Sequence, residues 1–372
     1  MIHSNTLEET KLWQVYIKKA KGDFARVAWT KEVFYMACEH LKAVRDTFDN
    51  YTLHDVTHVL NVQDAMAGLL GNRIKELEVG EAELLILVSA LHDLGMIYTN
   101  DDREWCFADK VKVQEYYSLH PDLQKVDVED WDEVDRQNYL RWLHPFRVVD
   151  ILQRPVWREQ FGRRPNEVAP EDVIIAVCRA HGEAPGKIRR EVTDSNGELR
   201  YQHTRNIDPL FCAILLRLAD ILDFDNSRAP SILFSYAGRS LKSVEEWKKH
   251  KASMGFTYPD EPSSDELHYG ANFTDQSIER SAHVFLDWVD DELSNSRSLL
   301  PLASSRWNQF PFPFQVNRSE IERTGYDYGD FRITMDQGQI MDLLVGENLY
   351  SDRSVFVREL LQNSIDATLL RA

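Results

Sequence analysis

The most apolar run of the chain, LLILVSALHDLG from Leu84 to Gly95, constrains the fold more than any other segment. A stretch that is apolar on every side indicates a helix buried all round, which needs a large helical core about it. The run ends in His92 and Asp93, and buried polar groups are costly unless they have partners. A divalent cation would satisfy both side chains. The alternative is a neutral histidine and an aspartate that caps nearby backbone, which is the commoner case for an isolated pair.

Two further segments place comparable residues on predicted helices. His54 and His58, in TLHDVTHVLNV, are four residues apart and so share one helix face, as paired histidines on one metal do. Asp208 precedes a proline and predicts a helix start with the aspartate as N-cap. Asp220 lies well inside that helix, LFCAILLRLADILDFD, where a carboxylate needs a cation. Either a metal or Arg217, one turn earlier, can supply it.

In order, these motifs resemble the His, His-Asp, Asp signature of the HD superfamily of metal-dependent phosphohydrolases. The resemblance covers roughly residues 52–228 and implies a helical domain that binds one divalent metal. The ligands that it implies for this metal are His58, His92, Asp93 and Asp220. Binuclear members hold a second metal, for which His144 and His181 are the candidates. Because Pro145 follows His144 and disfavours helical geometry there, His144 is either a ligand or a loop residue near the site.

The ligand types suit several metals. Imidazole and carboxylate without cysteine fit Mn, Mg, Fe, Ni, Co or Zn, and the sequence does not choose among them. One or two such ions can activate water and neutralise charge on a phosphoryl oxygen. With two ions, Asp93 is the predicted bridging ligand and a catalytic residue. His54 resembles the acid histidine of cyclic-nucleotide phosphodiesterases, which implies that it protonates the leaving oxygen; helix packing is the alternative.

Basic side chains near these ligands are candidates for binding the substrate phosphate. They are Arg179, Arg217, Arg228 and Lys187. Each arginine can equally form an ordinary ion pair. Lys187 begins the basic segment KIRREV, which with the turn signal DSNGE predicts a β-hairpin before the Asp220 helix. Such a hairpin either guides an anionic substrate or is simply solvated.

The segment from Met341 to Ala372 carries a second resemblance. LYSDRSVFVREL and RELLQNSIDA resemble the ATP-binding start of the ninety-kilodalton heat-shock chaperone and, more broadly, the GHKL ATPases. The resemblance implies that Glu359 orients the hydrolytic water, that Asn363 holds Mg²⁺ against ATP, and that Asp366 and Ala367 line the pocket. The glycine-rich lid of that family does not follow. We therefore expect a truncated ATPase domain without ATPase activity of its own; an ordinary amphipathic helix is the alternative.

Composition narrows the class of protein. With 43% hydrophobic and 28% charged residues, the 372-residue chain is typical of a folded soluble protein of two or three domains. A net charge of −18 disfavours a surface that coats nucleic acid. The sequence predicts no membrane span and no signal peptide. Four cysteines without CxxC spacing favour the cytoplasm and disfavour a cysteine zinc site.

The predicted fold is mainly α. It consists of an HD-type helical bundle with a small β-hairpin or strand insertion, then the first helix of a truncated α/β GHKL (Bergerat) ATPase fold. The predicted divisions are N-terminal helices over 1–50, the HD domain over 51–230, its C-terminal extension over 231–300, a connector over 301–337 and the start of the ATPase domain over 338–372. The extension contains strands at SILFSYAGRS and ASMGFTYPD, and helices at SVEEWKKHK and over 277–300. The connector is either a packed strap or a lever that transmits ATP-driven motion.

The leading hypothesis is a metal-dependent phosphohydrolase that acts on a nucleotide or nucleic-acid phosphoester and is regulated by the fused ATPase. A non-hydrolytic nucleotide or metal sensor, or a chaperone-like ATP-driven switch, is the alternative. The pairing of modules resembles bacterial antiviral defence systems, which is analogy rather than evidence from the site. Because such ATPases often work as dimers, a homodimer through a part beyond Ala372 is the expected assembly.

Overall fold

The structure is a computed structural model, and its contacts divide the chain into two compact units, Met1–Tyr326 and Asp327–Ala372. It describes residues 3–44, 48, 56–120, 123, 126–166, 168–193, 201–226, 241–263, 265–329 and 362. Several predicted site residues lie outside this description: His54, Arg228, Glu359, Asn363, Asp366 and Ala367. Their roles, and the predicted division of the chain into five segments, stay predictions.

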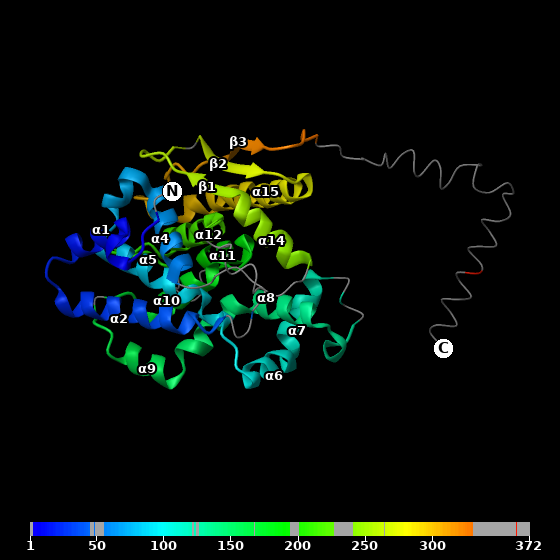
Figure 1. The fold of residues 1–372 in the computed structure, drawn as a ribbon. Coiled ribbons are helices and arrows are strands. Elements are labelled where there is room, and N and C mark those ends of the chain that lie inside the picture. The colour runs from blue at the N-terminus through cyan, green and yellow to red at the C-terminus, as the bar shows by residue number, and fades with distance from the viewer. Residues whose placement is uncertain are drawn as a thin grey trace. The chain divides into compact units, whose positions relative to one another are not determined.

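The first unit is mainly helical, as predicted, with one small sheet (Figure 1). Its α-helices among the described residues are α1 (Lys11–Ala20), α2 (Phe24–Leu41), α4 (Val56–Leu70), α5 (Val79–Leu91), α6 (Asn100–Ala108), α7 (Lys110–Leu119), α8 (Glu133–Leu152), α9 (Pro155–Gly162), α10 (Glu171–Ala180), α11 (Pro185–Thr193), α12 (Pro209–Leu222), α14 (Leu241–Ala252) and α15 (Gln276–Leu299). Its 3-10 turns are η1 (Leu7–Glu9), η2 (Gly71–Glu76), η3 (His92–Met96), η5 (Val128–Asp130) and η7 (Leu300–Leu302).

Helix α5 is the centre of this unit, and the prediction of a helix buried all round is confirmed. A capping box starts it: the Glu78 side chain accepts from backbone of the first turn, and the Glu81 carboxylate accepts from the Glu78 backbone N–H. Every residue from Gly80 to Leu91 is buried. Helices α1, α2, α4, α10 and α12 all pack against it. Burial of a single leucine stabilises the fold by about 1.5–3 kcal/mol, so this helix anchors its neighbours.

Helix α12 begins as predicted. The Asp208 carboxylate accepts from the Phe211 backbone N–H at 3.0 Å, and Pro209 occupies the first turn. The second carboxylate oxygen of Asp208 accepts from the Ser304 N–H at 2.6 Å, which ties the later chain to this helix start. Helix α12 packs on α4, α5, α10 and α15, and so carries Asp220 toward the end of α5.

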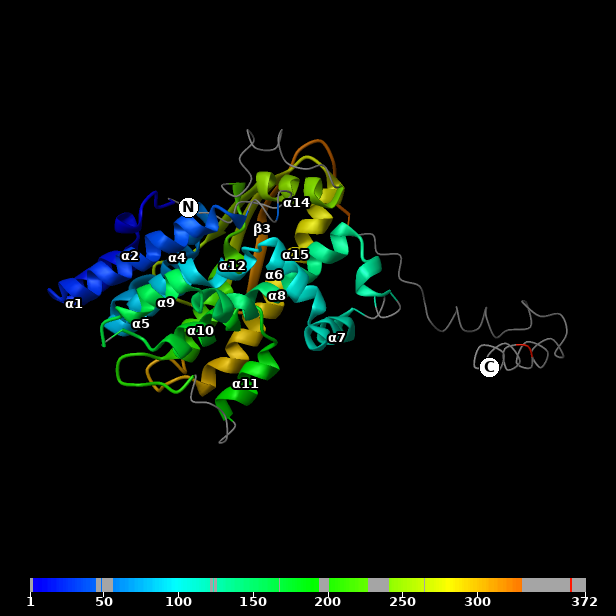
Figure 2. The ribbon, with the colours of Figure 1, turned by 90° about the horizontal axis from the view of Figure 1, so that it is seen from below.

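A three-stranded sheet in the order β1-β2-β3 lies beside α15 (Figures 1 and 2). The strands are β1 (Ser253–Thr257), β2 (Glu266–Phe273) and β3 (Gln315–Arg323). β1 and β2 are antiparallel with Phe256 opposite Tyr269, whereas β2 and β3 are parallel with Leu267 opposite Val316. α15 forms the crossover that parallel strands require. The predicted strand at ASMGFTYPD and the helices at SVEEWKKHK and 277–300 are confirmed; SILFSYAGRS lies outside the described residues.

The β-hairpin predicted from KIRREV is wrong where the structure describes it. Residues Pro185–Thr193 form α11. Proline suits the first turn of a helix, and Ile188 is buried with the partly buried Val192 four residues on, which is helical spacing. The turn signal DSNGE lies outside the described residues.

The segment predicted as a connector contains β3 and a packed aromatic stretch. Trp307 stacks on Phe211 of α12, with ring centroids 4.2 Å apart and planes 2° from parallel. Phe310 and Phe312 are buried beside them. A packed strap and a lever were the two alternatives for this segment. The burial of these aromatic side chains on α12 is that of a packed strap.

Among the described residues, no single helix is long and apolar enough to cross a membrane. The segments Val79–Met96 and Asn100–Ala108 reach that length and apolar content only when they are counted together, and the chain bends sharply between them.

Candidate metal centre

Four histidines and two aspartates from five separate segments meet in the helical unit. α4 provides one of them, η3 two, and α8, α12 and the residue after α10 one each. They are the six predicted ligands, His58, His92, Asp93, His144, His181 and Asp220.

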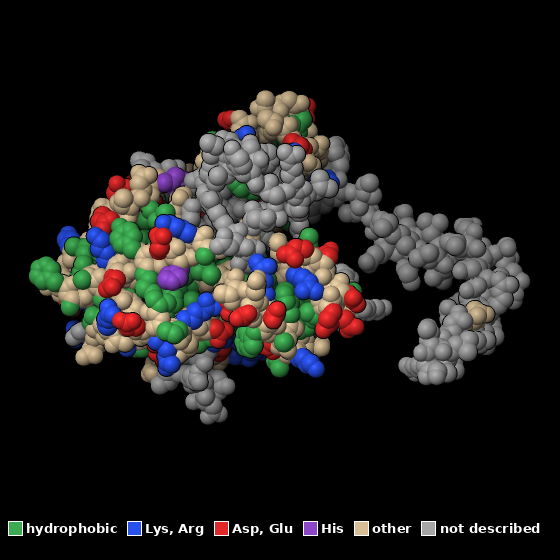
Figure 3. Space-filling view, turned by 60° about the horizontal axis from the view of Figure 1, so that its bottom comes forward, with side chains coloured by type: hydrophobic (Ala, Val, Ile, Leu, Met, Phe, Trp, Pro, Cys, Tyr) green, Lys and Arg blue, Asp and Glu red, His purple; other side chains and the backbone are tan. Residues whose placement is uncertain are grey.

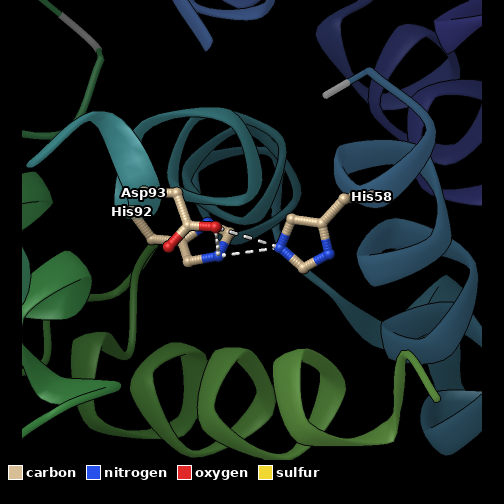
Figure 4. Close-up of side chains that lie close together, drawn as sticks. All are labelled: His58, His92 and Asp93. Atoms are coloured by element: carbon tan, nitrogen blue, oxygen red, sulfur yellow. Dashed lines mark hydrogen bonds and ion pairs between the residues drawn. The ribbon is translucent and has the colours of Figure 1, made fainter. Parts of the chain in front are cut away.

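The first group surrounds Nε2 of His58 (Figure 4). This nitrogen lies 3.2 Å from Asp93 Oδ2, 3.3 Å from His92 Nε2 and 3.5 Å from Asp220 Oδ1. His92 Nε2 lies 3.4 Å and 3.6 Å from the same two carboxylate oxygens. His58, His92 and Asp93 are buried, whereas the Asp220 side chain is 30% exposed and gives the group an opening.

The second group lies on the other side of Asp93. Asp93 Oδ1 is 3.2 Å from His144 Nε2, and His144 Nε2 is 2.8 Å from His181 Nε2. Asp93 therefore directs one oxygen to each group. This is the position that a carboxylate bridging two metals would occupy.

The second nitrogen of each histidine ring identifies the tautomer. Nδ1 of His58 lies 2.6 Å from Asp223 Oδ2, and Nδ1 of His92 lies 3.0 Å from the Ser89 carbonyl oxygen. Nδ1 of His144 and of His181 each contact the carbonyl oxygen three residues earlier. Because oxygen acceptors require the proton on Nδ1, Nε2 is the nitrogen that faces the centre in all four rings.

His144 lies inside α8, so the loop alternative that Pro145 suggested is wrong. Proline in a helix removes the N–H that would bond the carbonyl four residues earlier, here that of Arg141. In the structure, His144 Nδ1 donates to this carbonyl instead. The proline thus frees the acceptor that orients the histidine ring.

Two glycines allow α8 to approach the other ligand segments. A Cβ atom on Gly95 would clash with the His144 carbonyl oxygen, and one on Gly182 would clash with Pro145 Cγ. Arg147 adds hydrogen bonds from Nη1 to the Gly95 and Ile97 carbonyl oxygens, at 2.6 and 3.0 Å. Close backbone approach at glycine brings the turn with Asp93 and the helix with His144 together.

The electrostatics suit metal binding. Burial lowers the pKa of His181 to about 3, and the His144 and His92 rings add to this shift, so the ring is neutral as a ligand must be. Burial also acts to lower the pKa of His92, but Asp93 and Asp220 outweigh it and raise the pKa, so this ring has to give up a more tightly held proton when it binds a metal. Burial acts to raise the pKa of Asp220, but His92 holds it well below its usual range. Asp220 therefore offers an ionised carboxylate.

The donor set fits divalent metal. Two nitrogens on one metal at about 2.1 Å lie roughly 3.0–3.4 Å apart, and the 3.3 Å between His58 and His92 Nε2 falls in that range. Two neutral nitrogens with facing lone pairs repel unless a cation or proton lies between them. The His/Asp cluster can thus hold a divalent ion; the donors alone do not identify it.

Of the predicted phosphate-binding arginines, the two that the structure describes have other partners. Arg217 is buried, contacts both carboxylate oxygens of Glu292, at 2.7 and 3.0 Å, and donates to the carbonyls of Ala180 and Glu183. The ion pair of Arg217 with Asp220, which was the alternative to a metal there, is not formed, because the donors of Arg217 are directed to these other groups. Arg179 pairs with the Glu183 carboxylate.

Asp223 and Asn61 belong to the site and were not predicted. Asp223 holds His58 Nδ1, and Asn61 Nδ2 donates to its other oxygen at 2.9 Å. A sequence signal existed, since Asp223 follows Asp220 by three residues and Asn61 follows His58 by three. That spacing places each pair on one helix face, but it does not tell which acid binds metal and which orients a ring.

Asp223→Asn is expected to weaken metal binding by about 10–100-fold, because a carboxylate behind a histidine fixes its tautomer and raises its basicity. Metal affinity is measured by calorimetric titration of metal-depleted protein. Asp225→Asn is the matched control, since Asp225 lies two residues on and pairs with His3 at 2.8 Å. Equal metal affinity in Asp223→Asn and wild type would show that Asp223 does not act through His58.

Residues 48–295 match the model of the HD-CE family, which is more than half of the chain, and the chain belongs to this family. With the His/Asp cluster, the match identifies an HD-type domain, a class whose members are generally metal-dependent hydrolases. No curated protein and no solved structure matches the chain significantly. The resemblance of the C-terminal segment to GHKL ATPases stays a prediction.

Proposed function

We propose that the protein is a metal-dependent phosphohydrolase that acts on a nucleotide or nucleic-acid phosphoester. The observation that carries this proposal is the position of Asp93 between two histidine pairs, each with its Nε2 atoms directed inward. Membership of the HD-CE family supports the same class of reaction.

In this proposal, one metal is held by four residues, His58, His92, Asp93 and Asp220, and a second by Asp93, His144 and His181. A divalent metal supplies Lewis-acid chemistry at phosphoryl oxygen, which the side chains do not provide. The residues of the chain hold and orient it: Asp223 fixes the His58 ring, and the Arg141 carbonyl fixes the His144 ring. Asp220, the most exposed of these acids, lines the cleft.

Regulation is the second part of the proposal. A fused chaperone-type ATPase would control hydrolysis, in a cytoplasmic homodimer and in bacterial antiviral defence. The sequence resemblance supports the regulation, the homodimer and the defence role, and the cysteine pattern supports the cytoplasm.

The proposal is tested by metal depletion and reconstitution of the full chain. Protein treated with chelator is reloaded separately with Mn, Mg, Fe, Ni, Co or Zn and assayed on nucleotides, cyclic nucleotides and single strands. We expect release of phosphate or nucleoside from at least one substrate with at least one metal, and none from the depleted protein.

A protein that binds metal and nucleotide tightly but turns over no phosphoester would overturn hydrolysis and support the sensor. Turnover that persists at full rate after complete removal of metal would also contradict the proposal.

A further inference from the structure

Three cations from three helices surround one aromatic ring beside the candidate metal centre. Phe146 lies on α8, two residues after His144. The Nζ atoms of Lys112 (α7) and Lys187 (α11) lie 4.2 and 5.2 Å from its ring centroid. Cζ of Arg179 (α10) lies 5.9 Å from the same centroid. The ring therefore gathers positive charge from segments far apart in the sequence.

These cations outnumber the carboxylates that pair with them. Glu183 pairs with both Arg179 and Lys187, the latter at 3.1 Å, and Glu115 pairs with Lys112 at 2.8 Å. Three cations against two carboxylates leave one positive charge. Two cations at one carboxylate also repel each other, and a bound anion would relieve this repulsion.

The cation cluster reaches the cleft of the metal centre through Phe146 and Lys187. A cleft of about 1400 Å³ is lined by Phe146, Lys187 and Glu183 as well as by Asp93 and His181. An anion beside Phe146 and Lys187 would thus share one cavity with a phosphate at the metal centre.

The rest of the cleft wall carries both signs of charge. Glu133, Glu245, Glu246 and Glu292 line it, and so do Arg141, Arg217 and Lys249. Arg217 pairs with Glu292, and Lys249 pairs with Glu246. The described side chains on the face in Figure 3 likewise mix acidic and basic groups without a broad basic area. A nucleic-acid strand needs concentrated cations along its whole path, whereas a small polyanion needs only the metal centre and one cation cluster.

We propose that Lys112, Arg179 and Lys187 form an anion subsite for a second phosphate group, which makes the substrate a nucleoside di- or triphosphate. This inference rests on the proposed function: one phosphate lies at the metal centre and another at the subsite. Arg179 offers a planar fork and the two lysines offer point charges, the usual partners of phosphate oxygens.

The test measures binding without turnover. The metal-loaded full chain is titrated calorimetrically with a nucleoside monophosphate and with a methylene-bridged, non-hydrolysable triphosphate of the same base. We expect the triphosphate analogue to bind at least about tenfold more tightly, since a hydrogen bond to a charged group contributes that much or more. Lys112→Met and Lys187→Met keep the side-chain stem and remove the charge, so each should lower this preference several-fold.

Lys110→Met and Arg190→Met are the matched controls, because both residues are exposed and lie on the same two helices, α7 and α11. They should leave the preference unchanged. Three results would overturn the subsite. The first is equal affinity for both nucleotides, and the second is an unaltered preference in Lys112→Met and Lys187→Met. The third is tighter binding of a single strand than of the triphosphate. Hydrolysis of monophosphates by the same protein would remain intact in these cases, so the two proposals fail separately.

Discussion

The double variant His92→Ala/Asp93→Ala is expected to lose phosphoester hydrolysis by at least about a thousandfold, because both groups of the centre share Asp93. Metal should also cease to stabilise the protein. A ligand at a hundred times its Kd raises the unfolding free energy by about 2.7 kcal/mol, and this increment should be absent in the variant. Hydrolysis rates and thermal unfolding with and without metal measure both effects.

The variant His92→Ala/Asp93→Ala, which should bind no metal, is expected to remain folded. Both side chains are buried, so alanine leaves a cavity that costs some stability, but the substitutions also remove the close approach of two histidine nitrogens at 3.3 Å. His203→Ala/Asp101→Ala, which changes the same residue types at exposed positions, is the control and should behave as wild type. Full hydrolysis in a folded His92→Ala/Asp93→Ala protein would exclude this centre as the catalytic site.

Periodic and local signals in the sequence predicted a large part of the fold. α5 was predictable because its apolar residues have no polar face, and α12 because Asp208 and the following proline mark a helix start independently of tertiary contacts. The approach of His58 to His92 was predicted only through family resemblance. Helical spacing alone does not bring two helices together.

Contacts between segments that are far apart in the sequence could not be predicted from local sequence patterns. β2 and β3 meet only because α15 crosses between them, and neither strand alternates cleanly between apolar and polar residues. α8 keeps its helix through Pro145 because the His144 side chain satisfies the carbonyl that proline leaves. The role of Asp223 likewise depends on α4 and α12 packing side by side.

Removal of Arg26 is expected to produce a large loss of stability at a position away from the candidate site. Its guanidinium contacts Glu83 of α5 through Nε, at 3.0 Å from both carboxylate oxygens, and through Nη2, at 2.6 Å. Both residues are buried, and Tyr16 and Thr30 also donate to Glu83. Arg26→Met leaves this carboxylate buried without its cation, which costs about 3–5 kcal/mol. Chemical denaturation measures the loss.

The matched variants separate the ion pair from general packing. Arg158→Met, at an exposed position of α9, should change the unfolding free energy by less than about 0.5 kcal/mol. Arg26→Met/Glu83→Gln should recover part of the loss, since a neutral amide can still bond Tyr16 and Thr30 without an uncompensated charge. If the double variant is less stable than Arg26→Met by the full cost of a second core substitution, the two side chains are not coupled. If the two side chains are coupled, their ion pair holds α2 against the first turns of α5. His92 and Asp93 directly follow the other end of α5.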